Sequence, residues 1–186
     1  PSAEIRANRT HHVLDPSLVL LVLVVSQAPD DAFDGLVRAL RAQGTTLVIG
    51  GCTAPRRMLG GPCLAARAAL RSGGGLAVLA VPESLATAAL TILPEATALP
   101  LPIEEVCAGP ALDLVQDAAI GAHAIVCGPG LGGPRDIDRL VGMVADLEDR
   151  PRVLDADALN SIATMPERSY RGPLILTPHP GEWNRM

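Results

Sequence analysis

The stretch AIVCGPGLGGP, residues 124–134, contains the features that decide the fold. Its first four residues are an uninterrupted apolar run, which is typical of a strand buried on both faces of a parallel sheet. The glycines at 128, 130, 132 and 133 allow sharp turns and close approach of the backbone to a neighbouring group. Pro134 suits the first turn of a helix, which we predict over 135–147. Strand, glycine loop and helix in this order predict one βα unit of an α/β sheet.

The same order recurs along the rest of the 186 residues. We predict strands over 18–25, 45–49, 76–81, 124–127, 152–154 and 174–176. We predict helices over 30–43, 60–71, 82–93, 111–119 and 135–147, and a short helix that follows Asp157 and reaches about 162. Residues 94–110 contain four prolines and are predicted to be a surface connection. Alternating strands and helices favour one globular domain, built as a doubly wound, mainly parallel sheet with helices on both faces.

Composition excludes several function classes. The net charge is −5 and aromatic residues make up 2%, so neither a basic surface nor a stacking platform for nucleic acid is expected. All 15 basic residues are arginine, which excludes a Walker lysine and a Schiff-base lysine within this sequence. The longest apolar run, 18–25, is too short to span a membrane, and we read it as a strand rather than a signal peptide.

The four cysteines show no C-x-x-C spacing. We therefore expect neither a zinc site nor a disulfide framework, and we predict a reduced, cytoplasmic protein. No metal-ligating set of residues stands out in the sequence.

Three strand ends carry residues suited to binding or chemistry. After 124–127, the glycine loop could direct several N–H groups at an anion, or it could serve tight packing alone. Its G-x-G-x-G spacing does not fit the dinucleotide fingerprint G-x-G-x-x-G. After 152–154, the stretch DADALN places Asp155 and Asp157 on either side of one alanine. One is expected to cap the following helix, leaving the other for a ligand hydroxyl, Mg²⁺ or a proton.

The third strand end is TPHPGE, residues 177–182, where two prolines fix the backbone on either side of His179. Pro180 and Gly181 predict a turn, with Glu182 in the first turn of the next helix. Taken alone, such a histidine is more often structural than functional. Because ligands of open α/β sheets bind where strands end, three such loops together favour a shared site.

GPGLG, DADALN and TPHPGE, in this order and spacing, closely resemble the motifs of the ADP/ATP-dependent NAD(P)H-hydrate dehydratases, a family with the ribokinase-like fold. The stretch LVIGGCTAPRRMLGGPCLAARAALRSGGGLAVLAVPES, residues 47–84, is also similar to that family. The resemblance covers about 45–186 and not 1–44. We therefore divide the chain into an N-terminal strand–helix segment, 1–44, and a dehydratase-like domain, 45–186.

The resemblance implies a lyase of nicotinamide cofactor repair, which phosphorylates the hydroxyl of hydrated NADH or NADPH with ADP or ATP and Mg²⁺ and then eliminates it. It implies a dinucleotide pocket formed by the following residues: Gly61, Gly130, Leu131, Gly132, Asp155, Asp157, His179 and Glu182. It does not indicate whether the nucleotide is ADP or ATP, or whether the substrate is the NADH or the NADPH form.

The resemblance also implies a glycine-rich segment ending in Gly-Asp after TPHPGE, which would grip the nucleotide and supply the catalytic aspartate. The sequence ends at Met186, so we expect that aspartate beyond it and read the sheet as incomplete there. Two hypotheses stay open. In the first, the chain is a piece of a working dehydratase whose remaining segment is a separate, complementing chain, is disordered, or lies outside the given residues. In the second, it is an inactive truncated homologue that binds dinucleotide or serves as a structural subunit. A homo-oligomer is a further partner that stays open.

Overall fold

The computed structural model describes residues 23–25, 44–51, 58–102, 109–132, 134–166 and 169–186. Its strands are β1 (Leu23–Val25), β2 (Thr45–Ile49), β3 (Leu76–Pro82), β4 (Thr97–Leu101), β5 (Ala124–Cys127), β6 (Arg152–Leu154) and β7 (Leu174–Leu176). Its helices are α2 (Gly60–Arg71), α3 (Glu83–Ile92), α4 (Pro110–Gly121), α5 (Pro134–Ala145), α6 (Asp157–Ile162) and α7 (Pro180–Trp183). The helix predicted over 30–43 and the first part of the predicted strand, 18–22, lie outside these ranges.

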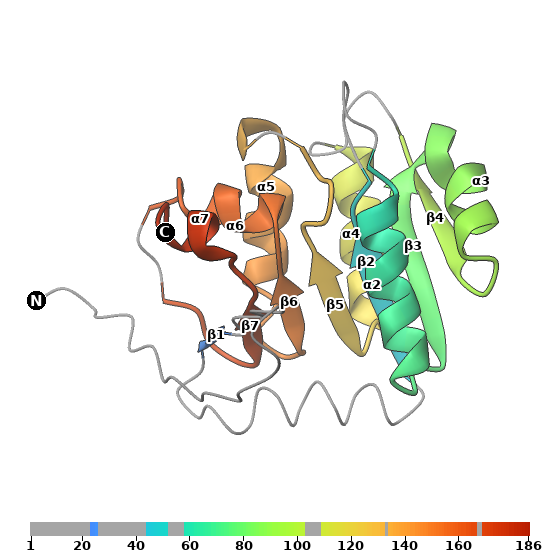
Figure 1. Cartoon of the computed structure of the whole chain (residues 1–186), viewed down its shortest axis with the longest axis horizontal. Helices are drawn as coiled ribbons and strands as arrows, with labels where there is room; N and C mark the ends of the chain where they lie inside the picture. The colour runs from blue at the N-terminus through green and yellow to red at the C-terminus, as the bar shows by residue number, and fades with distance from the viewer. Residues whose placement is uncertain (1–22, 26–43, 52–57, 103–108, 133, 167–168) are drawn as a thin grey trace, which may run out of the picture.

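The strands form one sheet in the order β1-β7-β6-β5-β2-β3-β4, as Figure 1 shows. All neighbours from β7 to β4 are parallel, and β1 is antiparallel to β7. From β2 the chain adds β3 and β4 on one side, and then returns through α4 to add β5, β6 and β7 on the other. The order of strands therefore reverses between β2 and β5, which is where open α/β sheets bind ligands.

Helices cover both faces of this sheet, so the prediction of a doubly wound α/β fold is confirmed. On one face Val48 and Leu79 pack with Cys63 of α2 and Ala89 of α3. On the other face Leu47 and Ile49 pack against α4, α5 and α6. Because adjacent residues of a strand point to opposite faces, the continuous apolar run of β2 supplies both cores. None of the helices in the described ranges combines the length and apolar character that a membrane crossing requires.

Two sequence predictions about strands were wrong. Residues 97–101 were predicted to lie in a connection, but they form β4, the edge strand beside β3. An edge strand pairs on one side only, so it tolerates Pro100, which lacks an N–H group. The apolar run at 18–25 was taken as a parallel strand, but its described part, β1, is antiparallel to β7.

Candidate functional site

The loops that follow β2, β5, β6 and β7 lie side by side at the carboxyl edge of the sheet (Figure 1). Main-chain hydrogen bonds join them beyond the strand ends. The N–H of Gly128 donates to the carbonyl of Ile49 (3.3 Å), that of Asp155 to Cys127 (3.1 Å), and that of Thr177 to Leu154 (3.3 Å). The three loops singled out from the sequence are therefore brought together at one edge, next to the point where strand order reverses.

The glycine loop after β5 requires glycine for close packing. Gly128 has φ of +133°, and a Cβ there would lie 1.7 Å from the carbonyl oxygen of Asp155. Gly130 has φ of +70°, and a Cβ there would lie 2.6 Å from the carbonyl oxygen of Met58. Gly132 also has a positive φ, +104°. The tight-packing hypothesis is thus confirmed for Gly128 and Gly130, and it does not exclude a ligand.

The N–H groups of this loop are nearly all engaged. Gly128 donates to Ile49, Leu131 donates to the carbonyl of Gly128 (3.1 Å), and Gly132 donates to the Oδ2 atom of Asp157 (2.9 Å). Pro129 has no N–H group. Within the described ranges the N–H of Gly130 has no hydrogen-bond partner. Among residues 128–132 it is therefore the donor available to an acceptor atom of a ligand. Leu131 is buried and belongs to the hydrophobic core.

The start of α2 packs against the same loop. A Cβ on Gly61 would lie 3.0 Å from the Cβ of Pro129, and one on Gly50 would lie 2.3 Å from the Pro129 carbonyl oxygen. The N–H of Gly51 donates to that carbonyl (3.1 Å). Gly61, expected to line the pocket, therefore lies where the β2 and β5 loops meet.

The two aspartates of DADALN do not cap α6, so that prediction was wrong. The cap position is held by Ala156, and no side chain bonds to the free N–H groups of the first turn. Instead Asp155 accepts a hydrogen bond from the hydroxyl of Thr177 (2.8 Å), and Asp157 accepts the one from Gly132. Each carboxylate links β6 to a different neighbouring loop. Thr177 was not singled out from the sequence, although its place directly after a buried strand was a usable signal.

Ala156, between these aspartates, has φ of +51° and ψ of −116°. It is the non-glycine residue with positive φ in the described part of the chain. An L-residue in this region is strained by about 1–3 kcal/mol, and such strain concentrates at functional loops.

We expect the Ala156→Gly variant to be more stable than the parent chain by about 1 kcal/mol, because glycine adopts this backbone conformation without strain. Urea unfolding would measure the change. The matched control is Ala163→Gly: Ala163 ends α6 at φ of −60°, so glycine there should lower stability by about 0.5–1 kcal/mol. Equal losses for both variants would show that Ala156 is not strained.

His179 and Glu182 form a reciprocal cap at the start of α7. The Nδ1 atom of His179 accepts from the N–H groups of Gly181 (3.0 Å) and Glu182 (3.3 Å). The Oε2 atom of Glu182 accepts from the N–H of His179 (2.9 Å), and its Oε1 atom lies 3.3 Å from Nε2. Glu182 is buried, whereas the side chain of His179 is 63% exposed. The expected helical position of Glu182 is confirmed. The cap fixes the orientation of the His179 side chain, whose imidazole is exposed to solvent.

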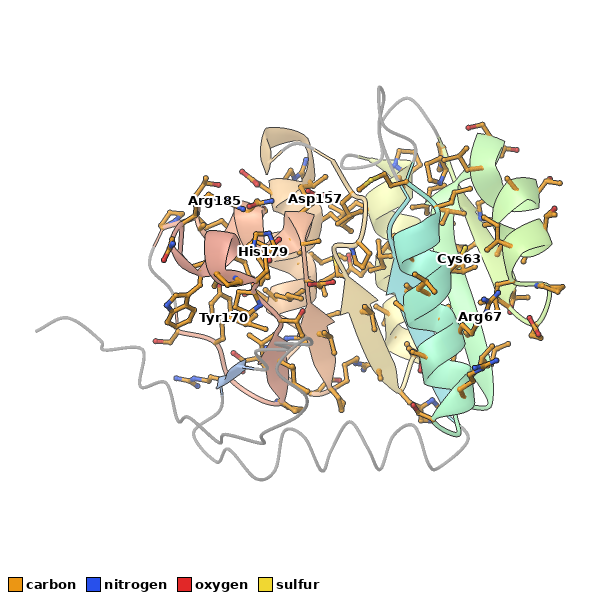
Figure 2. All side chains as sticks on the ribbon, in the orientation of Figure 1. Cys63, Arg67, Asp157, Tyr170, His179 and Arg185 are labelled. Atoms are coloured by element: carbon orange, nitrogen blue, oxygen red, sulfur yellow. The ribbon has the colours of Figure 1, made fainter. Side chains whose placement is uncertain are left out.

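Two further residues tie α7 to α6. The Nε and Nη2 atoms of Arg185 donate to the Oδ1 atom of Asn160 (3.1 and 2.8 Å). Figure 2 shows Asp157, His179 and Arg185 on the elements that follow β6 and β7. No three His, Cys, Asp or Glu side chains within the described ranges gather as metal ligands. The site as described therefore offers the N–H of Gly130, an exposed imidazole and a closely packed glycine loop.

A family model described as NAD(P)H-hydrate dehydratase matches residues 46–186. A bifunctional NAD(P)H-hydrate repair enzyme of Salinibacter ruber is 40% identical over 152 residues, which is 77% of this chain and 27% of that protein. The corresponding enzyme of Gloeobacter violaceus is 40% identical over 167 residues, 85% of this chain and 31% of that protein.

Solved structures agree with these matches. The ADP/ATP-dependent NAD(P)H-hydrate dehydratase of Bacillus subtilis, co-crystallised with ATP and Mg²⁺ and soaked with CoA, superposes with a TM-score of 0.58 at 32% identity, over 81% of this chain and 53% of that one. A ribokinase-like protein of Enterococcus faecalis superposes with a TM-score of 0.64 at 22% identity, over 87% and 52%, and shows the fold alone. The chain spans under a third of these curated relatives and about half of these solved chains.

Proposed function

The chain belongs to the NAD(P)H-hydrate dehydratase family, and we propose that it takes part in removing water from hydrated NADH or NADPH at the expense of ADP or ATP. The family match over 46–186 supports this function over that of an inactive binding or structural subunit. We place the reaction in the cytoplasm, in a homo-oligomer or together with a complementing segment.

The observation that carries the proposal is the unpaired N–H of Gly130 beside the reversal of strand order. We propose that it donates to an oxygen of the hydrated dinucleotide, and that Gly61 and the backbone of Leu131 and Gly132 form the adjoining wall. The exposed ring of His179 would contact the same ligand, while Glu182 holds that ring in place through the cap. Asp155 and Asp157 would support this wall through the hydrogen bonds that fix its loops.

The nucleotide and Mg²⁺ belong to the whole reaction, where they supply and transfer a phosphoryl group. The described residues do not form a metal-ligand set, so we assign none of them to Mg²⁺ and derive no step through it. The contribution we propose for this chain is binding and orienting the hydrated ring.

Isothermal titration of the chain with NADH hydrate and with NADH tests the proposal. We expect the hydrate to bind at least about tenfold more tightly, because a site that hydrogen-bonds a substrate hydroxyl rejects the analogue without it. Equal affinity for the two ligands, or none for either, would rule out the proposed function for this chain.

We expect His179→Ala to weaken hydrate binding about tenfold, the effect of one lost hydrogen bond to a ligand. The matched variant is His179→Asn, which keeps a side-chain acceptor for the cap of α7 but removes the imidazole. Titration should show both variants weakened. Full affinity of His179→Asn would mean that the histidine acts only as a helix cap.

A further inference from the structure

The carboxylate of Asp157 bonds to the glycine loop rather than to its own helix. Its Oδ2 atom lies 2.9 Å from the N of Gly132, on a loop 25 positions earlier in the chain. Asp157 is half-buried. It lies in the first turn of α6, the helix that follows β6, and β6 is the strand next to β5. A hydrogen bond to an ionised carboxylate is stronger than one between neutral groups.

This bond holds the N–H of Gly132 through a side chain from another element. The N–H groups of Gly128 and Leu131 are held by main-chain carbonyls, and Gly132 is held by Asp157. The unpaired N–H of Gly130 lies between them, in a segment whose glycines at 128, 130 and 132 all have positive φ. Glycine backbone is intrinsically flexible, so the direction of that N–H depends on bonds at both ends of the loop.

The backbone conformation of Ala156, the residue before Asp157, also directs this carboxylate toward the glycine loop. Ala156 keeps a strained conformation that separates the two aspartates, with Asp155 bonded toward β7 and Asp157 bonded toward β5. The carboxylate of Asp157 also occupies the amide of Gly132, so a phosphate group would meet a negative charge there.

We propose that Asp157 is a positioning residue that does not itself touch the substrate: by holding Gly132 it aims the free N–H of Gly130 at an uncharged oxygen of the hydrated dinucleotide. This inference rests on the proposed function. A contact that holds a binding group in place improves affinity, because the loop then loses less conformational entropy when the ligand binds.

Two variants and a control test the role. Asp157→Ala removes the acceptor, and Asp157→Asn keeps an acceptor oxygen without the charge. The control is Asp138→Ala, which removes another half-buried carboxylate, one that bonds Ser161 and so links α5 to α6 without contacting the loop. NADH hydrate affinity is measured by titration, and hydrogen exchange of the Gly130 and Gly132 amides by NMR.

We expect Asp157→Ala to bind the hydrate at least about tenfold more weakly and to exchange the Gly132 amide at least about tenfold faster. Asp157→Asn should stay within about threefold of the parent in both measurements, since a neutral acceptor restores the contact. Asp138→Ala should match the parent in both, although it lowers stability.

Parental affinity of Asp157→Ala would overturn the inference, as would unchanged exchange at Gly132. If Asp157→Asn is as weak as Asp157→Ala, the charge itself is needed and the positioning role is wrong. Failure of the proposed function gives a different result: the parent chain then binds no hydrate, whereas the Gly132 amide still responds to Asp157→Ala.

Discussion

The Gly128→Ala variant should lose about 4 kcal/mol of its free energy of unfolding, from backbone strain and overpacking together. A Cβ at this position would lie 1.7 Å from the carbonyl oxygen of Asp155 and 3.0 Å from the Cβ of Ala158. The first contact is with backbone, so no side chain can turn aside to relieve it. The φ of +133° is in addition a conformation that alanine avoids.

Urea unfolding followed by circular dichroism would measure this loss. Because small domains are stable by about 5–15 kcal/mol, the variant should unfold at a much lower urea concentration or fail to fold. The control is Gly121→Ala at the end of α4, where an added Cβ meets nothing within 4 Å. We expect the control to equal or slightly exceed the parent in stability. A similar result for Gly128→Ala would show that the β5 and β6 loops are not packed as described.

The Arg152→Met variant should lose about 3 kcal/mol, because it leaves buried carbonyl groups without their donors. Arg152 is the first residue of β6, so it lies at the amino ends of the strands, away from the candidate site at their carboxyl ends. Its side chain is fully buried. The guanidinium donates to the carbonyls of Ala145 (2.9 Å) and Arg171 (2.6 Å), and more weakly to those of Arg150 and Pro173. It therefore joins the end of α5 to the segment before β7.

Burial lowers the pKa of Arg152, and the nearby acidic groups, Glu148 first among them, act in the opposite direction. The side chain stays charged because arginine titrates far above neutral pH. Arg152→Lys should thus recover part of the loss by keeping a charge and one or two donors. The control Arg139→Met, at an exposed position of α5, should change stability by less than about 0.5 kcal/mol. Equal urea midpoints for Arg152→Met and Arg139→Met would contradict the buried role.

Most of the described sheet could be predicted from the sequence because its strands are buried on both faces. The runs at 124–127 and 174–176 are apolar throughout, and the run at 45–49 is apolar after two threonines. Each is followed by glycine or threonine, so their bounds agree with the structure. β4 could not be predicted in this way. Its proline and the three others within 94–110 indicate a connection, and only its position at the edge explains why it pairs with β3.

The candidate site was predictable as a set of loops and not as a set of contacts. Strand ends of a parallel sheet meet at one edge, so GPGLG, DADALN and TPHPGE could be placed together. The pairing of Gly132 with Asp157, and of Thr177 with Asp155, depends on the register of neighbouring strands, which the sequence does not specify. The buried Arg152 gave no signal either, because an arginine at a strand start is usually exposed.

The pairing of β1 with β7 has a consequence for the order in which the sheet assembles. It joins segments about 150 residues apart, roughly twice the separation of β2 and β5, and longer closures cost more chain entropy. Among the described strands, β1 is the first to be synthesised and its partner β7 is the last. We therefore expect β1 to dock last. Until it does, the edge of β7 that pairs with β1 is open, and an open strand edge promotes aggregation.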